Sequence, residues 1–221
     1  MYALKGSEVI NKGLVKTSGH GSVGIKAEKG SFGLNLDKVI TTGNGAHSMY
    51  ALEGSDVINK GLVKTSGHGA IGIKAEKGSF GLNLDKVITT GNGAHGMYAL
   101  EGSDVINKGL VKTTGHGSVG IKAEKGSFGL NLDKVITSGR GAHGMYAEDR
   151  SKVVNKDLVV TKGVRAVGMK AEDESTAINT GKVITRGDNA YGMYALDDSF
   201  VGNFGDGIVR TRGEGSHGMF A

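Results

Sequence analysis

A repeat of 24 residues runs through the chain and constrains its fold more than any other feature. Residues 49–72 read MYALEGSDVINKGLVKTSGHGAIG, and residues 73–96 read IKAEKGSFGLNLDKVITTGNGAHG. We number the 24 positions of each unit as slots 1 to 24. The ninth unit contains two extra residues, and a tenth begins at Met219. The repeat predicts one continuous domain, residues 1–221, whose units begin near residues 1, 25, 49, 73, 97, 121, 145, 169 and 193.

Each unit contains three short stretches of strand-like alternation, separated by Gly and Asn. Several glycines per unit argue against helices, because each costs a helix interior about 1 kcal/mol. With 40 Gly, no Trp, and aromatic residues at 5%, the chain also lacks the bulky side chains of an ordinary globular core. Three strands and three turns per unit predict an all-β fold, a single-stranded parallel β-solenoid (β-helix) of about nine rungs. Right-handed coiling is the expectation for such parallel crossovers.

The alternation also predicts which slots face the interior. Slots 1 and 3, which hold Met or Ile and then Ala, are expected to point inward, as are Val at slot 15 and Thr at slot 17. The same-slot Asn of each unit is expected to form a side-chain ladder along the stack. The Ser row at slot 7 and the Thr row at slot 17 are expected to satisfy their hydroxyls in the same way. The ladder asparagines are Asn11, Asn35, Asn59, Asn83, Asn107, Asn131, Asn155 and Asn179.

The outward slots repeat every two units rather than every unit. Slot 2 alternates Tyr with Lys, and slot 5 alternates Lys with Glu from residue 29 to residue 125. Same-slot residues of adjacent rungs are neighbours in a parallel stack, so repeated like charges would repel. Alternation is expected to replace that repulsion with ion pairs and cation–π contacts. We interpret the 48-residue period as a consequence of this stacking.

Metal-binding, phosphate-binding and catalytic sites receive little support from the sequence. Within a row the histidines recur every second rung, about 9.6 Å apart, which is too far for two of them to share a zinc ion. We therefore expect surface histidines lining turns, with no metal site and no cofactor. GNGAHG has no following helix, so it predicts a turn rather than a phosphate loop. Nothing resembles a catalytic constellation, and residues 202–207 (GNFGDG) indicate a bulge or loop. The histidines are His20, His68, His116, His47, His95, His143 and His217.

The best candidate for a binding face combines slots 12, 14 and 16, where Lys alternates with Leu and Ile. This face predicts either a solvated sheet guarded against aggregation by lysines, or a basic and apolar stripe. The stripe would suit a polyanionic glycan, lipopolysaccharide or the lateral packing of rods. The net charge of +5 comes from interspersed acids and bases and does not indicate nucleic-acid binding, and no apolar run suits membrane insertion. The lysines of the candidate binding face at slots 12, 14 and 16 are Lys12, Lys16, Lys38, Lys60, Lys64, Lys86, Lys108, Lys112 and Lys134.

The segments NKDLVVTKGVRAVGMKA and NTGKVITRGDNAYGMYA resemble the passenger repeats of Gram-negative autotransporter adhesins. This resemblance extends over essentially the whole chain. It implies a β-helical passenger, exported across the outer membrane to the cell surface or the extracellular medium, and often adhesive. The sequence thus favours a structural, adhesive, non-enzymatic rod or fibre segment. A phage tail-fibre segment and a glycan-processing β-helix enzyme are the alternatives.

The expected partners are other copies of the chain and surface glycans. The first and last units lack the polar or helical caps that solenoids usually have. The sequence therefore favours a segment of a longer chain, or rods that associate end to end.

Overall fold

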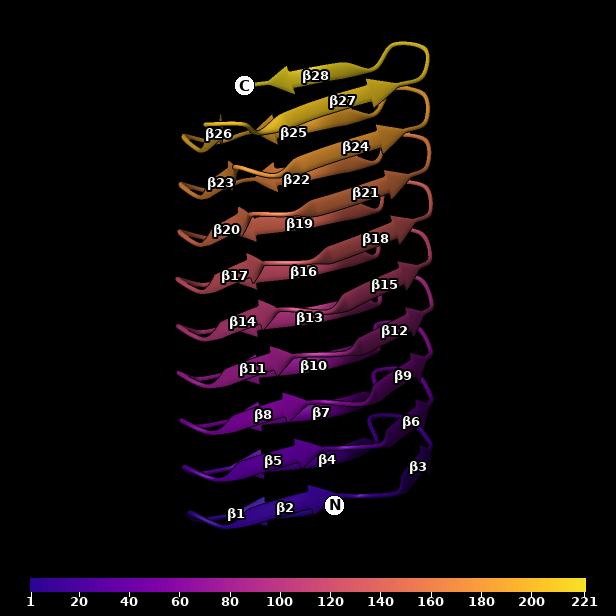
Figure 1. Cartoon of the computed structure of the whole chain (residues 1–221), viewed down its shortest axis with the longest axis vertical. Coiled ribbons are helices and arrows are strands. Elements are labelled where there is room, and N and C mark those ends of the chain that lie inside the picture. Colours follow the sequence, from indigo (N-terminus) through magenta and orange to yellow (C-terminus); the bar gives the residue numbers. More distant parts are fainter.

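The computed structural model describes residues 1–221 and contains 28 β-strands and no helix. The strands wind into stacked rungs that form a rod, with the two termini at opposite ends (Figure 1). No helix in the chain is long and apolar enough to cross a membrane. The predicted parallel β-solenoid of about nine 24-residue rungs is confirmed.

Three parallel sheets, here called A, B and C, make up the sides of the rod. Sheet A contains β1 (Tyr2–Leu4), β4 (Val23–Glu28), β7 (His47–Leu52), β10 (Ile71–Glu76), β13 (His95–Leu100), β16 (Val119–Glu124), β19 (His143–Glu148), β22 (Val167–Ala171), β25 (Tyr191–Ala195) and β28 (His217–Phe220). Sheet B contains β2 (Glu8–Asn11), β5 (Phe32–Asn35), β8 (Asp56–Asn59), β11 (Phe80–Asn83), β14 (Asp104–Asn107), β17 (Phe128–Asn131), β20 (Lys152–Asn155), β23 (Thr176–Asn179) and β26 (Phe200–Asn203). Sheet C contains β3 (Leu14–Ser18), β6 (Lys38–Thr42), β9 (Leu62–Ser66), β12 (Lys86–Thr90), β15 (Leu110–Thr114), β18 (Lys134–Ser138), β21 (Leu158–Lys162), β24 (Lys182–Arg186) and β27 (Ile208–Arg212).

Strand pairing keeps every slot above the same slot of the next rung. Tyr50 pairs with Lys74, and Lys74 pairs with Tyr98. The two extra residues of the ninth rung fall in the turn between β26 and β27, and the register recovers at once. The expectation of a loop at residues 202–207 is therefore confirmed for this turn, although Gly202 and Asn203 still belong to β26.

The core is a single column of small and medium apolar side chains from all three sheets. Met49, Ala51 and Val63 are fully buried, as the alternation predicts for slots 1, 3 and 15. The interior also alternates every two rungs. Gly81 at slot 9 leaves space for Ile73, because a Cβ there would lie 2.8 Å from the Ile73 Cγ2 atom. Rungs with Met at slot 1 instead carry a larger residue at slot 9, so the core as well as the surface sets the 48-residue period.

The asparagine ladder lies on the inner side of sheet B. Each Asn donates a hydrogen bond from Nδ2 to Oδ1 of the same-slot Asn in the next rung, at 2.7–2.8 Å from Asn11 through Asn203. The amide also donates to backbone carbonyls at the turn that follows. The ladder prediction is confirmed, and its bonds satisfy polar groups that are buried in the rod.

The serine and threonine rows differ from each other. Along slot 7 the backbone N–H of one Ser donates to the Oγ of the next, at 2.9–3.3 Å. The Thr41 hydroxyl pairs with Ser48 at 3.0 Å. From the third to the eighth rung slot 24 holds Gly instead of Ser, and the Thr hydroxyls have no partner. The predicted Thr ladder is therefore wrong, because hydroxyls one rung apart, about 4.8 Å, cannot reach each other. The unpaired hydroxyls belong to Thr65, Thr89, Thr113, Thr137, Thr161 and Thr185.

Candidate binding surfaces

The outer face of sheet A is a closed network of internal contacts. Lys74 Nζ lies 4.9 Å from the centre of the Tyr50 ring and forms an ion pair with Glu76. The Tyr50 hydroxyl donates to the same carboxylate at 2.6 Å. Equivalent contacts recur along the stack, which confirms the predicted cation–π pairs. The charged groups of this face are thus committed to one another.

The pKa values of this network follow from its contacts. Burial and the hydrogen bond to Glu124 raise the pKa of Tyr98. Burial alone would raise the pKa of Glu124 as well, but hydrogen bonds from Lys122 and Tyr98 more than offset it and lower that pKa. Both carboxylate and ammonium are therefore held in their charged forms.

Two rows of histidines occupy different environments. His20, His68 and His116 are exposed in turns, as expected. The rings of His47, His95 and His143 instead lie at the start of β7, β13 and β19, against Tyr50, Tyr98 and Tyr146 at centroid distances of 5.5–5.7 Å. The expectation that this second row lines turns is wrong, because the strands begin earlier than the Gly-rich segment suggests.

The strand histidines are half-buried side chains. Their Nδ1 atoms are buried without a hydrogen bond. Burial lowers the pKa of each to about 4. No group of three His, Asp or Glu side chains is arranged to hold a metal ion.

The outer face of sheet C is basic throughout. Its outward slots are 14, 16 and 18, and none of them holds an acidic residue in any rung. No ion pair in the chain involves any of these side chains. The face therefore presents unneutralised positive charge between aliphatic side chains. Its basic residues are Lys16, Lys38, Lys64, Lys86, Lys112, Lys134, Lys162, Lys182, Arg186, Arg210 and Arg212.

Only part of this surface was predicted from the sequence. The basic residues not predicted lie in the last three rungs. At slot 18, Lys162, Arg186 and Arg212 replace Ser or Thr, while Lys182 stands at slot 14 and Arg210 at slot 16. Continuing the alternation of slots 14 and 16 by one step would have found slot 18.

Lys12, Lys60 and Lys108 belong to a different surface. The backbone N–H of Lys60 donates to the carbonyl of Asn35 at 2.8 Å, which continues the sheet B ladder by one residue. Slot 12 therefore shares the outer face of sheet B, and the corner separates it from slots 14 and 16. Aspartates at slot 13 also stand at this corner, where Asp85 and Asp133 help to line a shallow depression. The nine predicted lysines are thus divided between two faces that meet at this corner, where Lys86, Lys108 and Lys134 line the same depression.

The outer face of sheet B is mainly apolar. Slot 10 holds an aliphatic side chain in every rung from Ile10 to Ile178. Leu36 and Leu84 at slot 12 are 40% and 37% exposed. Charged residues border this column on both sides in alternate rungs.

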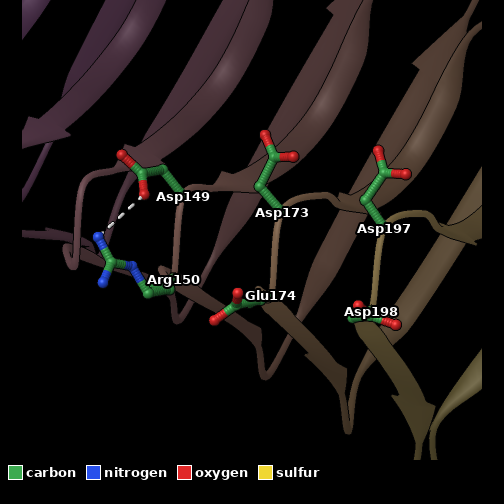
Figure 2. A pocket seen from close by; sticks show the side chains of 6 residues that line it. All are labelled: Asp149, Arg150, Asp173, Glu174, Asp197 and Asp198. Atoms are coloured by element: carbon green, nitrogen blue, oxygen red, sulfur yellow. Dashed lines mark ion pairs between the residues drawn. The ribbon is translucent and has the colours of Figure 1, made fainter.

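The turn between sheets A and B becomes acidic in the last three rungs. Asp173 and Asp197 stack in one row, with Glu174 and Asp198 beside them (Figure 2). One ion pair joins Asp149 to Arg150 at 3.5 Å. Burial and the carboxylates of Glu172 and Asp197 raise the pKa of Asp173. This row breaks the alternation of charge seen in the earlier rungs.

Comparison with known proteins identifies the family. The profile of the BigA third pectate lyase-like domain matches residues 85–221. The chain belongs to this family. No curated protein matches the chain.

A chain in the cryo-EM structure of the Vag8–C1 inhibitor complex has the same fold, with a TM-score of 0.84 over 99% of this BigA-type chain. The identity is 19%, and this chain spans 57% of the length of that one. The family match and the shared fold support the resemblance to autotransporter passenger repeats.

Proposed function

We propose that residues 1–221 form one continuous solenoid segment of a longer surface protein, whose sheet C face binds polyanionic polymers such as surface glycans. The proposed location is the outer surface of a Gram-negative bacterium or the surrounding medium. The proposed role is adhesive rather than enzymatic. The resemblance to autotransporter passengers supports both the location and the role.

A single observation carries the binding proposal: the basic groups of sheet C have no acidic partners, whereas those of sheet A do. Unpaired ammonium groups keep their counterions until a polyanion displaces them. In one slot column the lysines of the first six rungs stand two rungs apart, about 9.6 Å. Adjacent columns are offset by one rung, so the charges form a checkerboard rather than a single line. An extended polymer can cross this surface in more than one direction.

The test compares two variants of equal net charge. Lys64, Lys86 and Lys112 are replaced by Gln on sheet C, and Lys29, Lys77 and Lys125 are replaced by Gln in the turn between sheets A and B. Binding to immobilised heparin is measured as a function of salt. The sheet C variant is expected to lose about tenfold or more in affinity, with a weaker salt dependence, while the turn variant stays near the parent protein.

An equal loss of heparin affinity in the two variants would mean that binding depends only on net charge, and the sheet C proposal would then be wrong. The enzyme alternative has its own readout. Depolymerisation of a pectin or capsular polysaccharide by the purified chain would replace the adhesive role with a catalytic one.

A further inference from the structure

The apolar column of sheet B has no internal explanation, because side chains at slot 10 point away from the core. It extends along the first eight rungs without interruption. Its members are Ile10, Leu34, Ile58, Leu82, Ile106, Leu130, Val154 and Ile178. Ile10 is 42% exposed and the other seven side chains are half-buried, and contiguous apolar patches on a protein surface often mark contact sites.

The columns on either side of slot 10 alternate in step with each other. In the third rung Asp56 stands at slot 8 and Lys60 at slot 12. In the fourth rung the same slots hold Phe80 and Leu84. The first six rungs follow this scheme, so acidic groups always lie on one side of the apolar column and lysines on the other.

We propose that the outer face of sheet B docks a second copy of this chain, with the two rods parallel and their rungs in register. A twofold axis along the rod reverses the strand direction of the partner face but leaves the rung order unchanged. Slot 8 of one rod then faces slot 12 of the other. The carboxylate of Asp56 meets Lys60 of the second copy, Phe80 meets Leu84, and the slot 10 columns face each other.

Other arrangements of the same two faces are unfavourable. An antiparallel pair places slot 8 against slot 8, so that carboxylates face carboxylates or phenyl rings. A parallel pair offset by one rung places Asp56 against a leucine and buries its charge without a partner, which is costly. An offset of two rungs restores every match. The parallel arrangement can therefore form pairs and also staggered arrays.

The seventh rung limits the interface. Lys152 at slot 8 would face Lys156 at slot 12 of the partner, and like charges in contact repel. The complementary surface therefore covers the first six rungs. These span about 24 Å along the rod and about 13 Å across it, which is small beside the roughly 800 Å² per partner of a standard interface. A reversible pair in solution is expected, strengthened wherever several rods are held together.

Charge exchange across the interface provides the main test. One variant carries Asp56→Lys and Asp104→Lys, and the other carries Lys60→Asp and Lys108→Asp. All four positions are exposed. Sedimentation velocity over a wide concentration range should show self-association of the parent chain and at least a tenfold loss in either variant alone. An equimolar mixture should recover association, because each face then meets its opposite charge.

Cross-linking tests the orientation. The chain has no cysteine, so Ile10→Cys introduces a single thiol. A short bis-maleimide should join two Ile10→Cys molecules in a parallel pair. An antiparallel pair over the same six rungs would instead join Ile10→Cys to Leu130→Cys. Ile88→Cys on the outer face of sheet C is the matched control and should remain monomeric.

Each result is decisive. A parent chain that stays monomeric at every concentration, a mixture that fails to associate, or preferential cross-linking of Ile10→Cys to Leu130→Cys would overturn the proposal. Heparin binding through sheet C is measured with the Asp56→Lys and Asp104→Lys variant, which leaves the sheet C lysines and their surroundings unchanged, because Lys108 lines a corner depression together with Lys86 and Lys134. The two proposals can therefore fail separately.

Discussion

The first six rungs and the last three share one register but arrange their charges differently. In the earlier rungs slot 5 alternates, and Lys77 lies 3.8 Å from Glu53. In the later rungs slot 5 holds Asp three times in succession, while sheet C gains Lys162 and Arg186. The turn between sheets A and B therefore carries both signs of charge in the earlier rungs and is mainly acidic in the later ones, whereas sheet C is basic in both regions.

The core changes between the same two regions. Earlier rungs alternate Met–Val with Ile–Gly at slots 1 and 9, whereas the last three carry Met each time, with Ala177 or Val beside it. The hydrogen-bonded register and the asparagine ladder continue through both regions. The inward asparagine ladder is thus kept through both regions, while the core residues at slots 1 and 9 and the outward slots vary.

The largest expected effect comes from the strand histidines, which only the earlier region contains in this environment. Because their folded pKa of about 4 lies below the unfolded value of 6.5, their contribution to stability is complete above 6.5. It is lost as the pH falls toward 4. Replacing His47, His95 and His143 by Tyr, as at Tyr191, should recover about 3 kcal/mol per site at pH 4.

Denaturant unfolding at pH 7 and pH 4 measures this effect. His20, His68 and His116 provide the control, because these side chains are exposed and their replacement by Tyr should leave the pH dependence unchanged. A parent chain equally stable at both pH values would contradict the expectation.

Core volume gives the next effect. Gly81→Ala should destabilise the rod by about 1–3 kcal/mol, because the new Cβ would overlap Ile73 and press on Val105. Adding Ile73→Met converts the rung to the type found around Met169 and Ala177 and should restore most of the loss. Thermal unfolding of the single and double variants tests this coupling, and additive losses would exclude it.

The threonine row gives a smaller effect, of opposite sign in the second and the fourth rung. Thr89→Val removes an unpaired buried hydroxyl and should raise stability by about 1 kcal/mol. Thr41→Val breaks the hydrogen bond to Ser48 and should lower it by a similar amount. Matched denaturant titrations of the two variants give the answer, and the same sign for both would show that the pairing is irrelevant.

The smallest effect concerns the backbone of the turn between sheets A and B. Slot 6 has a positive φ in every rung, with Gly in the first six and Arg150, Glu174 or Asp198 in the last three. Glu174→Gly should therefore stabilise the rod by about 0.5 kcal/mol, and Gly78→Glu should destabilise it by about 1 kcal/mol. Differential scanning calorimetry resolves the two shifts. A gain from Gly78→Glu would contradict the assignment of strain.

Much of the architecture could be predicted because a repeat fixes which residues stack. The 24-residue spacing alone places Met49 above Ile25, and alternation alone places Ala51 and Val63 inside. The asparagine ladder follows from the same spacing, since an amide is long enough to reach the next rung. A hydroxyl group is too short to reach the next rung. The repeat does not give the distance between side-chain oxygens of adjacent rungs, so the predicted Thr ladder was wrong.

The binding surfaces were predicted less well because the alternation of inward and outward side chains does not tell which sheet a residue belongs to once the chain turns a corner. Lys60 and Lys64 are both at even slots, yet the turn between them places them on different faces. The environment of His95 depends on where the strand begins within the Gly-rich segment. A shift of one residue in that start decides whether the ring lies in the turn or on the sheet. The apolar column of sheet B could have been found by applying the slot analysis to slots 8 and 10 as well.

Lysine acetylation footprinting, read by mass spectrometry with and without heparin, tests the proposed function most directly. The account predicts slower acetylation of Lys64, Lys86, Lys112 and Lys134 in the complex, while Lys29, Lys77 and Lys125 react as in the free chain. Protection spread evenly over both groups, or confined to the second, would contradict the assignment of the binding surface to sheet C.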